Sequence, residues 1–200
     1  MCYLTLILCM AFAFVLGSIP FGLVIAKTIK GIDPRKAGSG SIGSTNVARL
    51  CGWPCGVLTL FCDIMKGTLP VLIAVHFMPE QFWQSLVALC AVLGHIKSPF
   101  LGFKGGKGVA TTIGALIPLA FLPLLCAVGC FFIVAFITRY VSLSSMTMAV
   151  ALVLFYALFG YWELMPLGIF LAVMIIWAHR ANIGRLMRGE ESKFSFKKKK

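Results

Sequence analysis

Apolar residues occur along this chain in long runs, and short polar or charged segments separate them. The first run covers residues 1–26 without a charged side chain, and later runs occupy 54–77, 82–99, 109–121, 123–138, 145–161 and 166–180. An α-helix rises ~1.5 Å per residue, so about 20 apolar residues cross the hydrocarbon core of a bilayer. The pattern therefore predicts an all-α polytopic integral membrane protein with seven transmembrane helices, the first over residues 3–26.

Composition supports the membrane class. Apolar residues make up 60% of the 200-residue chain and charged residues 12%, a charged share about half that of ordinary soluble domains. No internal repeat and no soluble segment interrupts the apolar runs. We expect a single membrane domain over residues 1–192, followed by a basic cytoplasmic tail over residues 193–200.

The distribution of charge predicts the orientation. All eighteen Lys and Arg residues lie in 27–49, at Lys66, in 97–107, at Arg139 or from Arg180 onward. The segments around Glu80 and Glu163 contain no basic residue. Because basic loops stay on the cytoplasmic side, we expect the N-terminus outside, the C-terminus inside and the polar loops between the basic runs in the cytoplasm.

The segment 109–138 is the least regular of the apolar runs. Its length is long for one span and short for two. Pro118 and Pro123 punctuate the middle, and two spans keep Arg139 on the inner side with the other basic segments. This segment therefore supplies two of the seven predicted spans.

Four polar segments on the predicted inner side share one chemistry. They offer hydrogen-bond donors or positive charge without a pair of carboxylates, and they cover residues 38–49, 103–112, 139–145 and 179–185. Such groups suit phosphate oxyanions and are poor ligands for a divalent metal. We expect a site for an anionic substrate, with no metal and no cofactor.

The most distinctive of these segments reads Lys104-Gly105-Gly106-Lys107-Gly108. Glycines let a backbone approach a ligand closely, and a helix starting at Val109 would direct its unpaired N–H groups and positive dipole end there. The pattern is not the nucleotide-binding loop G-x-x-x-x-G-K-[ST]. The alternative is a basic inner loop that only sets topology.

The eight cysteines favour no metal or redox site. Most lie inside apolar runs, and neither the pair Cys51 and Cys55 nor the pair Cys126 and Cys130 has a histidine or second cysteine pair at zinc spacing. We interpret the cysteines as small hydrophobic residues.

Two charged residues and one histidine lie inside predicted spans. Asp63 and Lys66 are three residues apart, so they share a helix face and can pair. Charges within a span are usually functional, but we favour a structural ion pair over a direct substrate role. For His95, a pocket lining and a satisfied histidine at a helix interface both remain open.

The polar segments also resemble a known family in their order along the chain. The resemblance rests on Gly38-Ser39-Gly40, Gly43, Thr45-Asn46-Val47, Arg49, Asp63, Lys66-Gly67, Gly94-His95, the run from Phe103 to Thr111, Ser142-Leu143, His179, Asn182-Ile183, Arg185-Leu186, Gly189 and Glu191. In these residues the chain resembles the bacterial acyl-phosphate:glycerol-3-phosphate acyltransferases. Ser41 and Ser44 depart from the family, which commonly has Asn and Ala there.

The resemblance implies a seven-span enzyme of the bacterial cytoplasmic (inner) membrane. Such an enzyme transfers a fatty acyl group from acyl phosphate to the sn-1 hydroxyl of glycerol 3-phosphate, giving lysophosphatidate and inorganic phosphate, the first acylation of phospholipid synthesis. It implies acyl phosphate, glycerol 3-phosphate and the lipid bilayer as partners, together with a cytosolic acyl-phosphate-forming enzyme, and no nucleic acid.

The resemblance also implies roles for individual residues. Phosphate binding falls to Ser39, Thr45, Asn46, Arg49, Lys104, Gly105, Gly106, Lys107, Gly108, Thr111 and Arg185. Catalytic roles fall to His179, Asn182, Ser142 and Lys104, with His179 and Asn182 orienting glycerol 3-phosphate. His179 either accepts the hydroxyl proton or only positions the substrate, and we favour positioning because acyl phosphate is already activated. Glu191 is expected to pin the C-terminal segment to a basic loop.

A small transporter for an organic phosphate is the rival interpretation. Transporters of that kind usually have two matching halves and bind substrate near the middle of the bilayer. This sequence shows neither feature, because its polar residues collect on one predicted side of the membrane. The sequence therefore favours chemistry on a lipid substrate.

Overall fold

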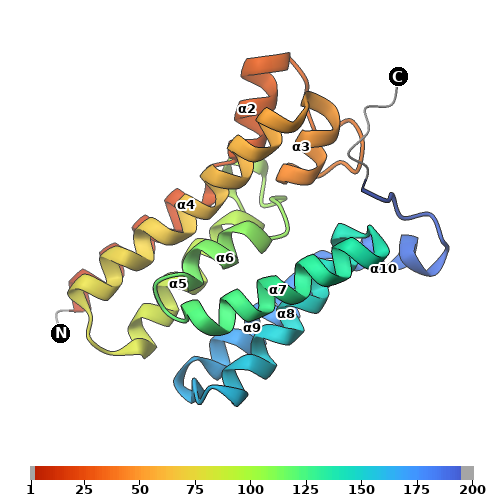
Figure 1. Cartoon of the computed structure of the whole chain (residues 1–200). Coiled ribbons are helices and arrows are strands. Elements are labelled where there is room, and N and C mark those ends of the chain that lie inside the picture. Colours follow the sequence, from red (N-terminus) through yellow and green to blue (C-terminus); the bar gives the residue numbers. More distant parts are fainter. Residues whose placement is uncertain (1–2, 195–200) are drawn as a thin grey trace. The chain divides into compact units, whose positions relative to one another are not determined.

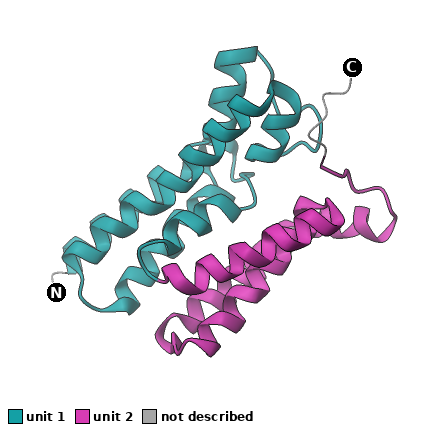
Figure 2. Cartoon of the chain, in the orientation of Figure 1, with its two compact units in different colours: residues 1–119 teal, residues 120–200 magenta. Residues whose placement is uncertain are grey.

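The computed structural model describes residues 3–194, and all regular structure in that range is helical. The all-α class is therefore confirmed for the described residues. The chain groups into two compact units, residues 1–119 and 120–200 (Figure 2), where the sequence predicted a single domain over 1–192. Of the basic tail predicted over 193–200, residues 195–200 lie outside the described residues.

Unit 1 is a bundle around one long helix (Figure 1). Its elements are α1 (Tyr3–Ser18), α2 (Phe21–Lys30), α3 (Ser44–Cys51), α4 (Trp53–Phe77), α5 (Gln81–Ile96), the short 3-10 helix η1 (Pro99–Leu101) and α6 (Val109–Leu116). Helix α4 contacts each of the other α-helices of the unit. The polar segments 31–43 and 97–108 connect α2 to α3 and α5 to α6.

The first predicted span is broken at Pro20, where the sequence analysis expected a continuous helix over 3–26. Proline lacks an N–H group and disrupts the helical hydrogen-bond pattern before it, which leaves carbonyl groups without helical partners. Two side chains supply the missing donors. Ser98 Oγ donates to the Ser18 carbonyl at 2.6 Å, and Lys66 Nζ donates to the Ile19 carbonyl at 2.8 Å. The break therefore brings the end of α1 together with α4 and the start of the loop 97–108.

Small residues let the helices of unit 1 approach closely. A Cβ added at Gly17 would collide with the backbone of Ala91 in α5, and one added at Gly67 would collide with the backbone of Thr111 in α6. Helix pairs inside membranes are held largely by such close packing, because lipid is as apolar as the side chains. The contacts fix α5 and α6, which flank the lysine-glycine loop.

Helix α6 is shorter than the predicted span over 109–121. It has 8 residues, a length of ~12 Å at ~1.5 Å per residue. Residues 117–119 form a turn, and α7 starts at Phe121, before Pro123. Helix α6 is thus too short to cross a hydrocarbon core of about 30 Å by itself.

Unit 2 contains two long antiparallel helices and a bent third element. Helices α7 (Phe121–Thr138) and α8 (Val141–Leu158) are followed by the 3-10 helix η2 (Trp162–Leu164), α9 (Met165–Ala178) and α10 (Arg180–Met187). The chain bends by 57° between the segment 162–178 and α10. After Gly189, which has a positive φ, residues 190–194 return to the start of α8.

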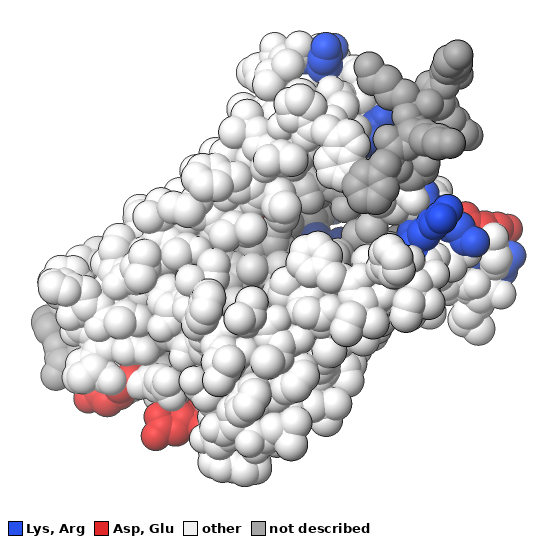
Figure 3. All heavy atoms as spheres, viewed as in Figure 1, with Lys and Arg blue, Asp and Glu red and all other residues white. Residues whose placement is uncertain are grey.

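Many exposed side chains are large and apolar, as expected for a lipid-facing surface. Phe136 is 88% exposed, and Figure 3 shows broad uncharged areas between small charged patches. Within residues 3–194, five helical segments are long and apolar enough to cross a membrane, or six if the bent pair ending in α10 counts as one span. The multi-pass class is confirmed, whereas the prediction of seven spans is not.

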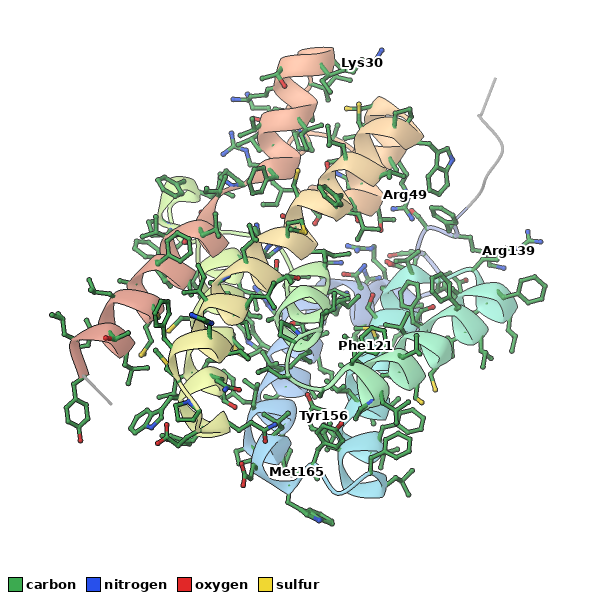
Figure 4. All side chains as sticks on the ribbon, turned by 60° about the vertical axis from the view of Figure 1, so that its left-hand side comes forward. Lys30, Arg49, Phe121, Arg139, Tyr156 and Met165 are labelled. Atoms are coloured by element: carbon green, nitrogen blue, oxygen red, sulfur yellow. The ribbon has the colours of Figure 1, made fainter. Side chains whose placement is uncertain are left out.

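Basic residues collect at one end of each unit, together with Asp33 in unit 1 and with Glu190 and Glu191 in unit 2. In unit 1, Lys30 and Arg49 lie at the α2 and α3 end (Figure 4), and Glu80 caps the start of α5 at the other end of α4. In unit 2, Arg139 lies at the far end of the helices from Met165, which directly follows η2 with its Glu163 (Figure 4). Within each unit this pattern matches the charge bias read from the sequence.

Candidate active site

The segment before α3 is organised by one buried amide. Asn46 is 1% exposed, and its Oδ1 accepts the N–H of Ser39 at 2.9 Å. Its Nδ2 lies within hydrogen-bond distance of the carbonyls of Pro34 (3.0 Å), Ala37 (3.2 Å) and Ser41 (2.8 Å). The expectation that Asn46 binds phosphate is therefore corrected, because its polar atoms are used to fold the loop that presents Ser39.

The other predicted ligands of this segment are accessible. Ser39 and Arg49 are exposed and Thr45 is half-buried. Arg49 comes from the last turn of α3 (Figure 4). These side chains remain candidates for phosphate contacts.

The lysine-glycine loop is a compact turn, and the backbone N–H groups in its first half donate to backbone carbonyls. The N–H of Phe103 donates to Ser98, that of Gly105 to Ile96 and that of Gly106 to His95, each to a backbone carbonyl. The expectation that the Gly105 and Gly106 amides hold a phosphate is therefore corrected, since they shape the turn. The N–H groups at the start of α6, after Gly108, stay candidates.

Lys104 and Lys107 sit on this turn. Lys104 is exposed and Lys107 half-buried. Gly108 has φ +81 and precedes the first residue of α6, a backbone conformation that glycine adopts freely. The turn therefore presents two amines close to a helix start, as an anion site requires.

Beneath the loop lies His95, 4% exposed. Its Nδ1 is 3.1 Å from Thr111 Oγ1, and a Cβ added at Gly106 would collide with its Nε2. The imidazole thus fills the space that a side chain at position 106 would need. Of the two alternatives left open by the sequence, the packed and hydrogen-bonded histidine fits this geometry. Thr111 is fully buried, and its phosphate contact stays a prediction.

A buried ion pair lies beside His95. Lys66 Nζ is 2.8 Å from Asp63 Oδ1, both side chains are almost fully buried, and His95 Nδ1 is 3.8 Å from the same oxygen. The predicted pairing of Asp63 with Lys66 is confirmed. Because Lys66 also donates to the Ile19 carbonyl at the helix break, its ammonium group has a structural use that the sequence analysis did not foresee.

In unit 2 the predicted residues converge on Glu191. Its Oε1 accepts hydrogen bonds from Ser142 Oγ at 2.7 Å and Asn182 Nδ2 at 2.6 Å, and its Oε2 pairs with Arg185 Nε at 2.7 Å. Glu191 therefore pins the C-terminal segment to α8 and α10, where a basic loop was expected. Arg185 is held by this carboxylate, and its phosphate contact stays a prediction.

The carboxylate of Glu191 is stabilised in its charged form. Burial favours the neutral acid, but the hydrogen bonds from Ser142 and Asn182 and the pairing with Arg185 outweigh it, so the pKa of Glu191 lies below its ordinary value. The ionised carboxylate of Glu191 therefore balances the positive charge of Arg185.

His179 lies at the bend between α9 and α10. It is 2% exposed, and its Nδ1 is 2.8 Å from the Ile175 carbonyl one turn earlier. An imidazole nitrogen can approach a carbonyl this closely only as a donor, so Nδ1 carries the proton and Nε2 is an acceptor in the neutral ring. Asn182 follows three residues later on the same face.

Metal ligation finds no support among the described side chains. Within residues 3–194 no group of three or more His, Cys, Asp or Glu residues could hold a metal ion. The seven described cysteines are unpaired thiols, all buried or half-buried. They pack as small hydrophobic residues, as the sequence analysis interpreted them.

Comparison with known proteins identifies the family. The model of the family described as glycerol-3-phosphate acyltransferase matches residues 7–189, which includes both units and nearly all of the polar segments. The chain belongs to the glycerol-3-phosphate acyltransferase family.

Curated relatives support this assignment. A glycerol-3-phosphate acyltransferase of Nitratidesulfovibrio vulgaris is 50% identical over 92% of this chain, although the chain spans only 57% of that relative's length. One from Desulfovibrio desulfuricans is 47% identical over 97% of this chain and 87% of the relative. One from Lawsonia intracellularis is 45% identical over 90% of both.

The fold of the glycerol-3-phosphate acyltransferase family is also known from crystal structures. This chain is similar to PlsY (YgiH), an integral membrane glycerol 3-phosphate acyltransferase, in its glycerol 3-phosphate form, with a TM-score of 0.92 and 40% identity over 96% of each chain. Its lysophosphatidic acid form has a TM-score of 0.89 at the same identity.

Two residues that depart from the usual family pattern have local roles. Ser41 Oγ accepts the N–H of Gly43 at 3.2 Å, and the Ser41 carbonyl accepts from Asn46. Ser44 is the first residue of α3. The sequence did not indicate that Ser98 binds the Ser18 carbonyl at the helix break or that the Ile175 carbonyl accepts from His179. The one signal in the sequence was Pro20, because a proline in a predicted helix indicates a break whose carbonyls need other donors.

Proposed function

We propose that this protein transfers a fatty acyl group from acyl phosphate to the sn-1 hydroxyl of glycerol 3-phosphate. The observation that carries the proposal is the match at 40% identity and TM-score 0.92 to a glycerol 3-phosphate form of an integral membrane acyltransferase. Family membership over residues 7–189 supports it. The products are lysophosphatidate and inorganic phosphate, and the step is the first acylation of phospholipid synthesis.

The chemistry needs positioning more than a protein nucleophile. The glycerol oxygen forms an ester bond to the acyl carbon, the bond from that carbon to the phosphate oxygen breaks, and phosphate leaves with the electron pair. Acyl phosphate is already activated, so aligning the hydroxyl with the acyl carbon and stabilising the developing charge supply most of the rate. No covalent acyl-enzyme is required.

The accessible cationic and hydroxyl groups bind the phosphate groups of the two substrates in this proposal. Lys104 and Lys107 on the lysine-glycine turn, Arg49 on α3 and the hydroxyls of Ser39 and Thr45 suit charge-assisted contacts with oxyanions. The start of α6 adds backbone N–H groups and the positive end of a helix dipole. Gly105 and Gly106 contribute by keeping the turn narrow.

His179 and Asn182 are assigned to glycerol 3-phosphate. The protonated Nδ1 of His179 faces the Ile175 carbonyl, which directs the acceptor nitrogen Nε2 to the other side of the ring. A hydrogen bond from the sn-1 hydroxyl to Nε2 would orient the attacking oxygen. The hydroxyl proton then passes to a phosphate oxygen of the substrate in the favoured version, or to Nε2 in the alternative. Ser142 acts through its bond to Glu191, which also holds Asn182.

The membrane setting follows from the substrate. The acyl chain stays in lipid while the phosphate reaches basic groups at the surface. We propose seven spans, in which α6 and the residues after it together make the crossing over 109–121, with the N-terminus outside and the basic ends of both units in the cytoplasm of a bacterial cell. A cytosolic enzyme that forms acyl phosphate would be the natural supplier.

The proposal is tested with purified protein in proteoliposomes. Inorganic phosphate should be released from long-chain acyl phosphate only when glycerol 3-phosphate is present, and one lysophosphatidate should form for each phosphate. Counterflow of glycerol 3-phosphate across the vesicle membrane without ester formation would instead establish the transporter alternative.

A further inference from the structure

Two phenylalanines stand on the outer face of the turn that carries the lysine-glycine loop. Phe100 is 62% exposed and Phe103 is 61% exposed, although each is a large apolar side chain. Phe100 belongs to η1 and Phe103 directly precedes Lys104. We call this pair the phenylalanine ledge.

Phe103 has a backbone conformation that bulky residues rarely adopt. Its φ is +62, and among the described residues only one other non-glycine residue, Arg139, has a positive φ. Gly102, with φ +60, precedes it, so the chain uses glycine at one left-handed position and phenylalanine at the next. Glycine would avoid the strain at 103. The aromatic ring is therefore retained at a cost, which indicates a use for the ring itself.

The depth of this turn in the bilayer determines whether lipid or water surrounds the ring of Phe103. Helix α5 has 16 residues, so it rises ~24 Å from Gln81 to Ile96. Helix α1 also has 16 residues, and the bond from Ser98 to the Ser18 carbonyl puts the two helix ends at one level. A hydrocarbon core is about 30 Å thick. With Gln81 at one surface, the turn begins before the core ends, and α2 and α3 continue beyond it.

A turn at that depth needs shielding on its lipid side. Irregular backbone at the depth of the hydrocarbon region occurs only where protein covers it or where it lines a water-filled cavity. The N–H groups of Leu101, Gly102, Phe103 and Lys104 all donate to carbonyls of the same turn. The two exposed rings cover this paired backbone with apolar surface.

We propose that the phenylalanine ledge inserts into the acyl chains of the bilayer and fixes the depth of the lysine-glycine loop. Lys104 follows Phe103 immediately, so a ring in hydrocarbon places the neighbouring ammonium group at the boundary where lipid phosphates lie. The ledge would thereby hold the loop at the depth in the bilayer where the fatty chain of acyl phosphate joins its phosphate group. This last step rests on the proposed function, whereas insertion of the rings does not.

The insertion is tested without any activity measurement. The photoreactive amino acid benzoylphenylalanine replaces Phe100, Phe103, Phe136 or Lys36 in full-length protein reconstituted in phosphatidylglycerol and phosphatidylethanolamine vesicles. Phe136 on α7 serves as the lipid-facing reference, and Lys36, exposed between α2 and α3, as the water-facing reference. Irradiation should give lipid adducts at positions 100, 103 and 136 but not at 36. Adducts at 136 without adducts at 103 would overturn the proposal.

The role in positioning is tested by kinetics on two donors. Phe103→Gly removes the ring and relaxes the backbone, Phe103→Leu keeps an apolar side chain, and Phe82→Ala removes a similarly exposed ring from the other end of α5. Phe103→Gly should raise KM for palmitoyl phosphate about tenfold with kcat unchanged. KM for water-soluble butyryl phosphate should not change, and Phe103→Leu and Phe82→Ala should resemble wild type.

An equal loss on both donors, or no loss on either, would show that the ring does not position a membrane-borne substrate. If the wild type transfers no acyl group at all, the proposed function fails, and the photolabelling still decides whether the ledge inserts.

Discussion

At the scale of single residues, the structure separates groups that face a ligand from groups that build the site. Asn46, Thr111 and Glu191 all belong to the motifs that carry the family resemblance. The polar atoms of Asn46 and Thr111 nevertheless form hydrogen bonds inside unit 1. The carboxylate of Glu191 accepts hydrogen bonds from Ser142, Asn182 and Arg185. A sequence motif records that a residue is needed without recording which atoms it contacts. The structural role of Asn46 could therefore not be predicted, whereas the role of Glu191 in holding the C-terminal segment was.

Asn46→Ala should destabilise the protein strongly. The change leaves the N–H of Ser39 and the carbonyls of Pro34, Ala37 and Ser41 without their partner, and the bond to Pro34 is fully buried. An unsatisfied buried group costs about 1–3 kcal/mol, so we expect a loss of about that size. Ser44→Ala is the matched control in the same segment. Equal unfolding midpoints in detergent for the two variants would contradict the structural role of Asn46.

Glu191 should make stability depend on pH. Its pKa is lowered on folding, so its contribution is complete at neutral pH and is lost as the pH falls below the ordinary carboxyl value and through the lowered one. Glu191→Gln should unfold at lower temperature than wild type near pH 7, and the gap should close as the pH falls through the acid range.

The neighbouring Glu190 provides the control for that experiment. It pairs with Arg188 on the surface, where both side chains are more than half exposed. Glu190→Gln should change stability little at any pH, because exposed ion pairs contribute about 0–1 kcal/mol. A gap for Glu191→Gln that stays constant with pH would show that the carboxylate charge is not what holds the C-terminal segment.

At the scale of helices, the lengths of the apolar runs predicted most elements, with two exceptions. The run 54–77 corresponds to α4 almost unchanged, although Pro70 lies inside that helix. The run 3–26 lies within one segment long and apolar enough to cross a membrane, but its helix is broken at Pro20, and the run 109–121 contains only the short α6. A hydropathy pattern measures apolar length and cannot show that Ser98 and Lys66 satisfy the carbonyls of a break.

Gly106→Ala should displace the lysine-glycine loop. Its Cβ would collide with the imidazole of His95 beneath the loop. A displacement of about 1 Å can lower activity on the order of a hundredfold, and we expect a loss of that size with normal membrane insertion. Gly129→Ala on α7 is the control, because no atom lies within 4 Å of a Cβ there. Unchanged turnover in well-inserted Gly106→Ala protein would remove the loop from the mechanism.

At the scale of the whole molecule, the apolar runs and the composition predicted the membrane class, and charge placement predicted that basic residues collect at one end of each unit. The number of spans was less predictable, because five or six segments of the described chain satisfy the length criterion and the sequence indicated seven. The phosphate chemistry was predictable from donors without paired carboxylates, and the family comparison agrees with it.

The proposed orientation can be measured by labelling. In a cysteine-free background, single cysteines at Glu80 and Glu163 should react with an impermeant thiol reagent added outside intact cells. Cysteines at Ser41, Gly105 and Ser144 should react only after the membrane is opened. Reaction of position 105 from outside would contradict both the orientation and the cytoplasmic site.

The central claim is that the acyl group moves and phosphate leaves. The most direct test uses acyl phosphate whose bridging oxygen, between the acyl carbon and phosphorus, carries a heavy isotope, together with glycerol 3-phosphate and reconstituted protein. Our account predicts that the label appears entirely in the released inorganic phosphate and that lysophosphatidate forms in equal amount without it. Label in the lipid product, or phosphate release without ester formation, would contradict acyl transfer to glycerol 3-phosphate.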